Sequence, residues 1–250
     1  MRGTCSRRSA SGCLSSGGRR MLRCSHILCK VRRIDDCVRD LELAGFSVQR
    51  GGAHNALVWF EQGPFLEFFE LPGWCRPLSL PFGLRFGRSA GRRLAFWAGA
   101  GEGWCDVALE PRGYRPDDPL HLDDIHRRLR ALAPGASRII NGSRNSAGGG
   151  RVRYRFITAG DRQLPFIVSH YHPPQRPERV RHANGARSVA QVDLRLPATA
   201  HAALGQLLPE DAWLKTHIGE RSLGVTLAGW RALPQTSRFI RRLFSTTQEP

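Results

Sequence analysis

Two side chains that handle protons and bind metals, His26 and Glu67, lie in apolar, strand-like segments of the sequence. Glu67 belongs to the run 65–71, in which Phe65, Glu67 and Phe69 share one face because strand side chains alternate. A carboxylate among aromatic rings is costly to bury unless it is paired or metal-bound. Its partner is therefore either a metal ion or one of the many arginines, and the residues alone leave both readings open.

A second chemical signal is a strand in which arginines alternate with apolar residues, from Arg151 to Phe156. One face of that strand is cationic. If this face lines a binding site, Arg153 and its neighbours would hold a carboxylate or phosphate by charge-assisted hydrogen bonds. If it faces water, it is an ordinary amphipathic strand. The sequence contains no phosphate-binding loop, no GxGxxG, no HExxH and no GxSxG.

The elements that must position these groups recur in the order βαβββ. The first set is predicted as a strand at 22–32, a short helix that Asp35 or Asp36 caps and Gly45 ends, and strands at 46–50, 54–60 and 65–71. The second set is a strand at 104–109, a helix with apolar residues at i, i+3, i+7 and i+10 from Leu122, and strands at 137–141, 151–158 and 164–170. A third, shorter set reads βαββ, with a strand at 187–196, a helix at 198–208 and strands at 213–217 and 223–230.

The stretch "HILCKVRRIDDCVRDLELAGFSV…HNALVWFEQGPFLEFFEL" resembles the first module of the glyoxalase-like branch of the vicinal-oxygen-chelate superfamily. The stretches "LPFIVSHYHP" and "HANGARSVAQVDLRL" are also similar to that family, so the resemblance covers roughly residues 22–232. It implies an α+β fold of the glyoxalase, bleomycin-resistance and dioxygenase type. Two paired βαβββ modules would form a cup-shaped mixed sheet, here with an additional βαββ segment.

The resemblance also implies a site. His26 matches the metal-ligand His on the first strand of the family's first module, and Glu67 matches its ligand Glu. The second module departs from the pattern, because it offers Trp104 or Cys105 on its first strand and Ser169 and His170 on its last. His170 is the best available third ligand. The expected cofactor is a divalent metal (Zn, Mn or Fe), and a site degenerated into a metal-free pocket is the alternative.

Substrate contacts are expected from three further residues. His54 would lie near the mouth of the cup in the family's geometry, although the pair His54-Asn55 also reads as a turn. Phe69 shares its strand face with Glu67, and Arg153 lies on the cationic strand. Gln191 begins the third set's strand at a position comparable to His26. The pair His26 and Glu67 carries the metal hypothesis; these other residues would shape the ligand.

The resemblance implies a metal-dependent lyase, isomerase or dioxygenase that acts on a small, oxygen-rich molecule, which would be an anion if the Arg151–Arg155 face lines the cup. The alternative is a metal-free binding or resistance protein on the same fold. The third reading, a protein associated with nucleic acid, rests on the formal net charge of +17 alone. Of the 38 basic residues only Lys30 and Lys215 are lysines, and the arginines are scattered rather than gathered in a stripe. No specific nucleic-acid partner is therefore expected.

The predicted organisation starts with a basic leader at 1–20, which holds five arginines and no acid. The first module follows at 21–72, and a Gly-, Pro- and Arg-rich linker or flap at 73–100 separates it from the second module at 101–172. The third segment spans 185–232, and the tail spans 233–250. The leader lacks the apolar stretch of a secretory signal and reads as a disordered leader, with organellar targeting left open. Part of the tail, 237–244, is basic and amphipathic. It either touches a membrane surface or packs back on the domain.

Compartment and partners follow from the cysteines and the apolar runs. The seven cysteines are odd in number and form no CxxC pair, so free thiols in a reducing, cytoplasmic compartment are expected. No apolar run approaches the length of a membrane span. The sequence leaves open whether the modules pair within one chain or across a homodimer.

Overall fold

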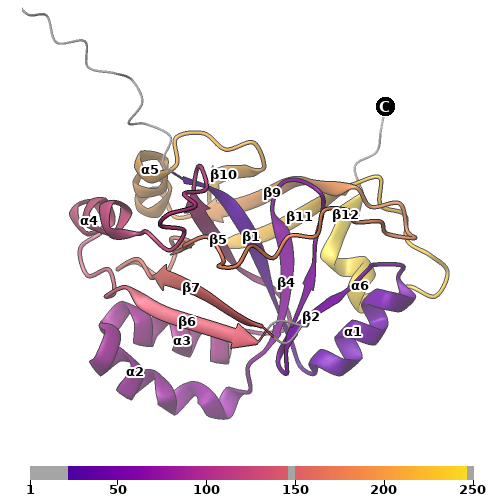
Figure 1. Cartoon of the computed structure of the whole chain (residues 1–250), viewed down its shortest axis with the longest axis horizontal. Coiled ribbons are helices and arrows are strands. Elements are labelled where there is room, and N and C mark those ends of the chain that lie inside the picture. Colours follow the sequence, from indigo (N-terminus) through magenta and orange to yellow (C-terminus); the bar gives the residue numbers. More distant parts are fainter. Residues whose placement is uncertain (1–21, 146–149, 247–250) are drawn as a thin grey trace, which may run out of the picture.

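The structure, a computed structural model, describes residues 22–145 and 150–246 (Figure 1). The leader, Cys5, Cys13 and most of the glycine run at 148–150 lie outside the described residues. The first module has the predicted order, with elements β1 (Leu22–Val31), α1 (Ile34–Leu43), β2 (Gln49–Gly52), β3 (Asn55–Val58) and β4 (Phe65–Glu70). Gly45 follows α1 with φ +81°. That left-handed conformation suits glycine and explains why the helix ends there.

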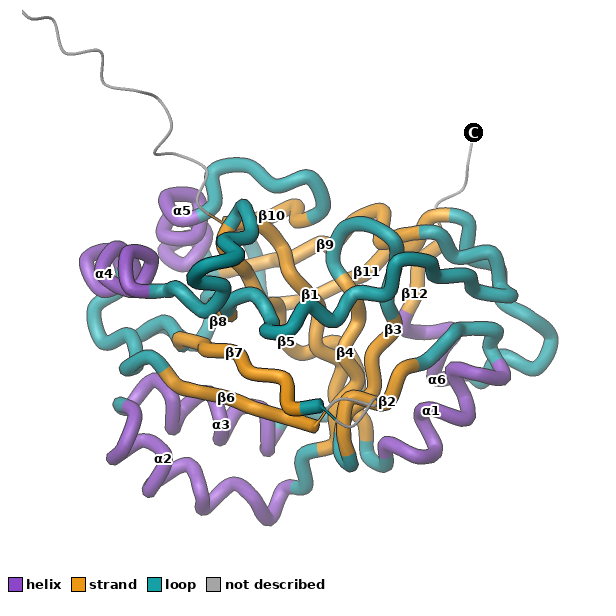
Figure 2. The backbone as a smooth tube through the Cα atoms, viewed as in Figure 1, coloured by secondary structure: helices purple, strands orange, loops and turns teal. Residues whose placement is uncertain are grey.

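The second module repeats this order as β5 (Gly103–Pro111), α4 (Asp123–Leu132), β6 (Ile140–Asn145), β7 (Arg151–Ile157) and β8 (Phe166–Val168). Strands β1 and β5 pair antiparallel and join both modules into one sheet, in the order β2-β3-β4-β1-β5-β8-β7-β6. The two modules therefore pair within one chain. The sheet is strongly curved and forms the cup of the predicted α+β fold (Figure 2).

The third segment adds a separate layer. Its elements are β9 (Ser188–Leu196), α5 (Ala198–Leu207), β10 (Leu214–Ile218) and β11 (Ser222–Ala228), followed by α6 (Arg238–Leu243) and β12 (Phe244–Thr246). They form a four-stranded sheet in the order β10-β9-β11-β12. One large apolar core joins Val107 and Ile27 of the cup sheet to Val192 of this second sheet and to α1, α4 and α5. The convex side of the cup is thus buried, and the concave side is left for a cavity.

The Gly-, Pro- and Arg-rich insert is not an irregular linker. It forms the 3₁₀ helix η2 (Gly73–Leu78) and the helices α2 (Ser79–Phe86) and α3 (Arg88–Gly99), which lie beside β6 and β7 with α2 outermost (Figure 1). Glycine makes this packing close, because a Cβ on Gly91 would lie 2.5 Å from the Ser79 carbonyl oxygen. The glycines that suggest a loop in the sequence therefore allow the backbones of two helices to pack closely.

Apolar residues of the tail and the described cysteines are buried. Ile240, Leu243 and Phe244 pack into the core, so the amphipathic tail packs back on the domain. The described cysteines are all buried free thiols, at positions 24, 29, 37, 75 and 105. Burial raises the pKa of the Cys37 thiol to about 12 and also raises the pKa of Cys24 and Cys29 well above the ordinary value. Within the described residues, no helix is long and apolar enough to cross a bilayer.

Candidate active site in the cup

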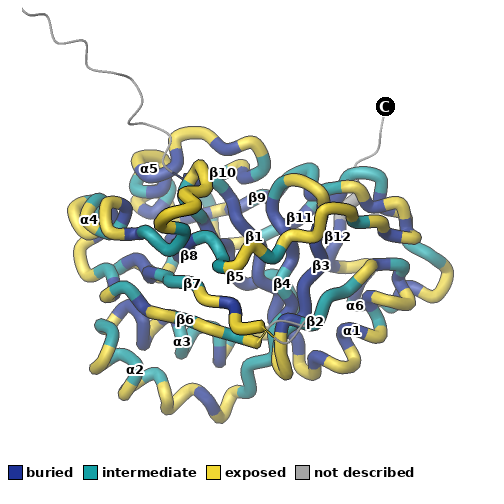
Figure 3. The backbone as a smooth tube through the Cα atoms, in the orientation of Figure 1, coloured by how far each residue is buried: buried dark blue, intermediate teal, exposed yellow. Residues whose placement is uncertain are grey.

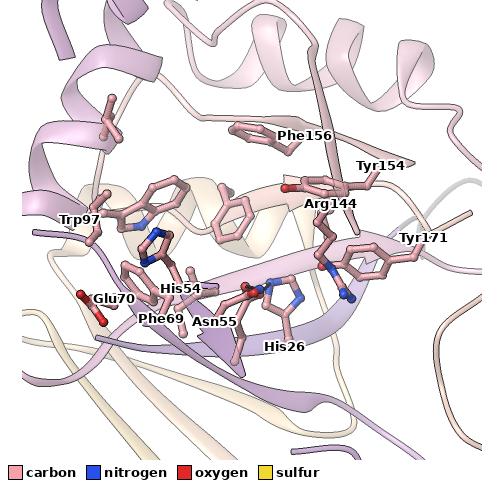
Figure 4. A pocket seen from close by; sticks show the side chains of 16 residues that line it. His26, His54, Asn55, Phe69, Glu70, Trp97, Arg144, Tyr154, Phe156 and Tyr171 are labelled. Carbon is pink, nitrogen blue, oxygen red and sulfur yellow. Dashed lines mark hydrogen bonds and ion pairs between the residues drawn. The ribbon is translucent and has the colours of Figure 1, made fainter. Parts of the chain in front are cut away.

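The concave side of the large sheet encloses a cavity of about 330 Å³, and Trp97 of α3 contributes to its wall (Figure 4). Most of its wall is apolar or aromatic, from Leu28, Phe69, Leu94, Trp97, Phe156, Phe166 and Val168. Its polar groups come mainly from the first module, as His26 on β1, Asn55 on β3 and Glu67 on β4. A mostly apolar pocket with a few convergent polar groups is the usual form of a small-molecule site.

His26 and Glu67, which the sequence singles out, meet at the base of this cavity. The His26 Nε2 atom lies 3.4 Å from Glu67 Oε2, and the imidazole is only 2% exposed. The neighbouring strands set this geometry, since β1 and β4 run parallel with Leu28 opposite Glu67 and His26 opposite Phe65. The Phe65 ring stacks on the imidazole at 4.6 Å and fixes its plane.

A hydrogen-bond chain behind the imidazole determines which of its nitrogens carries hydrogen. The Ser25 hydroxyl donates to Glu110 Oε2 at 2.8 Å, and Ser25 Oγ lies 3.2 Å from His26 Nδ1. Because the Ser25 proton is engaged by Glu110, Ser25 Oγ accepts the hydrogen of Nδ1. This assignment, made from the network, leaves Nε2 with a bare lone pair facing Glu67. Two acceptors at this distance need a proton or a cation between them.

Burial shifts both groups of the pair toward their neutral forms. Desolvation, with a smaller effect of the Arg144 charge, lowers the pKa of His26 to about 3, so the imidazole is neutral at pH 7. Desolvation also raises the pKa of Glu67, although the Asn55 hydrogen bond and Arg144 oppose this. Asn55 Nδ2 donates to Glu67 Oε1 at 2.9 Å. A neutral imidazole beside a carboxyl of raised pKa is an arrangement in which the protonated form of Glu67 can donate to Nε2.

Arg144 supplies a positive charge to the site. It lies on β6 and lines the cavity, with its guanidinium 5.6 Å from the Tyr171 ring centre and Nη1 donating to the Gly51 carbonyl at 3.1 Å. Figure 4 shows Arg144 and Tyr171 on one side of His26, with Trp97, His54 and Phe69 on the other. An anionic group in the cavity would meet this guanidinium.

The structure turns the predicted cationic strand face away from the cavity. Arg153 is exposed, and its neighbours Tyr154 and Phe156 are the β7 residues that line the cup. Sequence reasoning missed Arg144 because it ended the preceding strand at residue 141, whereas β6 continues to Asn145. It missed Trp97 because the insert reads as a linker. Phe69 lines the cavity as expected, and His54 lies in the turn before β3 and also lines it.

The expected third metal ligand lies elsewhere. His170 follows the end of β8, where its Nε2 is 3.1 Å from the Gly113 carbonyl and its Nδ1 is 3.9 Å from Glu110, and it does not line the cup cavity. Across the β1–β5 pairing Ala108 lies opposite His26, rather than Trp104 or Cys105. Gln191 belongs to the second sheet, where it bonds to Asp193.

The donor set does not fit the metal that the family implies. His26 and Glu67 point to a common position, but among residues 22–145 and 150–246 no three His, Cys, Asp or Glu side chains gather to hold an ion. Catalytic zinc sites use three protein ligands. In place of a third ligand this cavity presents the Arg144 cation, which lowers the pKa of both His26 and Glu67 and competes for the role of counter-charge.

The turn His182–Gly185 has a structural role. His182 Nδ1 accepts from the Ser47 amide at 3.0 Å, and Asn184 Nδ2 donates to the Ala44 carbonyl at the end of α1 at 2.7 Å. Gly185 has φ +79°, as the Asn-Gly turn requires. This turn fastens the start of the third segment to the first module, on the side of the sheet away from the cavity.

Comparison with known proteins places this geometry in a family. The glyoxalase-like domain family matches residues 24–208, which is most of the chain. A crystal structure of a hypothetical protein from Staphylococcus aureus superposes with a TM-score of 0.56 at 12% sequence identity, covering 83% of this chain and 92% of that one. At that identity the superposition shows a shared fold alone. None of the curated proteins matches the sequence.

Proposed function

The chain belongs to the glyoxalase-like domain family, and on that premise we propose that its cup binds a small, oxygen-rich anion with an apolar body and moves a proton on it. The observation that carries this proposal is the His26–Glu67 pair, whose facing lone pairs at 3.4 Å need a proton or a cation between them. The fold alone would not give a reaction, because one fold serves many. The reaction is inferred instead from the acid–base pair, which lies in a mostly apolar cavity.

Glu67 is the group that exchanges the proton. Its raised pKa brings its protonated and ionised forms closer to balance near neutral pH, where a general acid–base catalyst works best. In the ionised form Glu67 takes a proton from a carbon next to a carbonyl, and the electron pair moves to the carbonyl oxygen as an enolate. The same carboxyl then returns the proton. His26, neutral at pH 7, is a positioning residue whose Nε2 accepts a hydrogen bond from protonated Glu67 and fixes the direction of that side chain.

Arg144 holds the anionic end of the molecule. Its guanidinium is the charged donor at the cavity edge, and a charge-assisted hydrogen bond to a carboxylate is among the stronger ones in proteins. The aromatic wall of Phe69, Trp97 and Phe166 takes the apolar body. A 2-oxo acid with an aromatic side chain combines these features, because its carboxylate and keto oxygen are vicinal and the adjacent carbon is enolisable.

Exchange of the C3 protons of phenylpyruvate with D₂O, followed by NMR, tests the proposal. We expect the wild type to accelerate exchange, and Glu67→Gln to lose about a hundredfold or more of that rate. Arg144→Met should raise the half-saturating concentration about tenfold. Arg153→Met is the matched control, since it removes an arginine of the adjacent strand that lies outside the cup. A wild type no faster than Glu67→Gln would overturn proton transfer.

Two alternatives have their own outcomes. Binding of phenylpyruvate, seen as a thermal shift that Arg144→Met reduces, without exchange, would identify a metal-free binding protein on the same fold. The other alternative is a metal held by the pair, because the two donors point to a common position although no third ligand lies beside them among the described residues. Metal analysis after growth with Mn, Fe and Zn decides this. Stoichiometric metal in the wild type that is lost in His26→Ala and Glu67→Gln would replace the shared proton by a cation.

A further inference from the structure

The outer face of η2 and α2 is the most apolar exposed region of the described chain. Among the described residues seven large hydrophobic side chains are exposed, and four of the seven belong to this segment. They are Trp74 at 75% exposed, Leu78 at 51%, Leu80 at 70% and Leu84 at 79%. Single exposed leucines need no explanation, but a contiguous group on one short segment marks an interaction surface.

The packing of α2 explains why these side chains point outward. Helix α2 has no buried residue, and along its length it is exposed or intermediate (Figure 3). Its contact with α3 uses backbone instead, since a Cβ on Gly83 would lie 3.4 Å from the Gly91 Cα. Pro77, Leu80, Pro81 and Leu84 recur at i, i+3, i+4 and i+7 and therefore share the opposite face. The helix thus presents an apolar stripe away from the protein.

Charge along this part of the sequence has a single sign. From residue 71 to residue 101 the sequence holds five arginines and no Asp or Glu. Arg93 is buried and paired with Asp106. The other four, Arg76, Arg85, Arg88 and Arg92, are exposed. The Arg85 guanidinium lies 5.3 Å from the Phe86 ring centre, so its stem follows the apolar surface while its charge stays at the rim.

We propose that the outer face of residues 73–86 docks on an anionic lipid bilayer. An amphipathic helix with Trp and Leu on one side and cations beside them lies in the membrane interface plane, with its apolar face at the headgroup–acyl boundary. Trp74, Leu80 and Leu84 would enter that boundary, and the exposed Arg76 and Arg85 of the same segment would lie against the lipid phosphates. This inference does not rest on the proposed function of the cup.

Charge argues against two other occupants. In a two-fold dimer the same patch meets itself, so a second copy would bring arginines against arginines with no acid in the segment. The leader at residues 1–20 also carries five arginines and no acid. A bilayer that contains anionic lipid complements the patch in both charge and polarity.

Cosedimentation of the full chain with phosphatidylcholine vesicles, with and without phosphatidylserine, tests the proposal. We expect binding to the phosphatidylserine vesicles that weakens as salt rises. The double variant L80E/L84E should bind at least about tenfold more weakly. Leu43→Glu is the matched control, because Leu43 is an exposed leucine at the end of α1, outside the patch, and it should bind as the wild type does. Arg85→Glu should lose about fivefold on anionic vesicles only.

Three results would overturn the proposal. One is a wild type that does not sediment with anionic vesicles, and another is an L80E/L84E variant that binds as well as the wild type, which would assign binding to other arginines. The third is a wild-type dimer in size-exclusion chromatography that L80E/L84E dissociates while vesicle binding is unchanged, which would make a second copy the partner. Circular dichroism and urea midpoints equal to those of the wild type confirm that the variants are folded.

Discussion

The two modules bury polar groups in opposite ways. In the first module His26, Asn55 and Glu67 face the cavity, and the Glu67–His26 pair shifts toward its neutral forms. In the second module Asp106 is fully buried behind the wall, where it accepts from Arg93 Nη1 at 2.8 Å and from Trp97 Nε1 at 2.7 Å. Burial of charge by itself therefore does not mark a site. The polar groups of the first module line the cavity, where a ligand would meet them, whereas Asp106 of the second holds helix α3 in place.

Removing the structural charge should have the largest effect. Asp106→Ala leaves the buried Arg93 and the half-buried Arg221 without their carboxylate, and breaking a buried pair by deleting one partner costs about 3–5 kcal/mol. Urea unfolding measures this loss. Asp193→Ala on β9, whose carboxylate is partly exposed, is the control and should cost less than about 1 kcal/mol. Equal losses for the two variants would remove the distinction between the modules.

The next effect is a pH dependence that belongs to the first module. The pKa of His26 is about 3 in the folded chain and about 6.5 when unfolded. The unfolded chain therefore takes up this proton first as pH falls, and stability is lost below about 6.5 at about 1.4 kcal/mol per pH unit. Between pH 6.5 and 5 we expect His26→Gln to lose about 2 kcal/mol less than the wild type. His182, whose pKa burial also lowers, contributes equally to both proteins.

Urea unfolding at several pH values checks this slope. Glu67 acts in the opposite direction, because its raised pKa makes the folded chain bind the proton more tightly, so its contribution falls as pH rises. Glu67→Gln should therefore steepen the acid loss relative to the wild type. Parallel pH profiles for the wild type and His26→Gln would mean that the imidazole is not held neutral by burial.

A smaller effect is expected at Asn55. Its amide donates to Glu67 Oε1 and lowers the pKa of that carboxyl, so Asn55→Ala should raise the Glu67 pKa further. The pH profile of phenylpyruvate exchange, or NMR titration of the carboxyl, measures this shift. Asn141→Ala, which removes an exposed amide of β6, should leave the profile in place. An unshifted profile in Asn55→Ala would place the proton chemistry on another group.

The smallest effect is expected at His170. Its ring bonds to the Gly113 carbonyl outside the cup, so His170→Ala should change exchange kinetics less than about twofold, within ordinary scatter for a surface position. Glu67→Gln in the same assay provides the contrast. A loss of tenfold or more for His170→Ala would return this residue to the site and restore the predicted third ligand.

How much the sequence foretells depends on whether a signal is local. Alternation along β1 and β4 and the helical spacing in α4 are local patterns, so the βαβββ order and the meeting of His26 with Glu67 follow from the residues and the family resemblance. Arg144 could not be found this way, because its strand lies at the sheet edge and continues beyond its apolar residues. The helices α2 and α3 were missed because Arg93 and Gly91 suggest a loop in the sequence. Only the structure shows that Arg93 pairs with Asp106 and that Gly91 lets α2 pack closely on α3.

The buried thiols determine how the molecule is oxidised over time. Cys24 and Cys29 on β1, Cys37 on α1 and Cys105 on β5 belong to the elements at the junction of the modules, and burial raises the pKa of each. Thiolates, the reactive forms, are therefore scarce until these strands separate. Oxidation should therefore follow transient opening of the strands rather than cause it. The rate at which a thiol reagent labels these cysteines measures how often the central strands open.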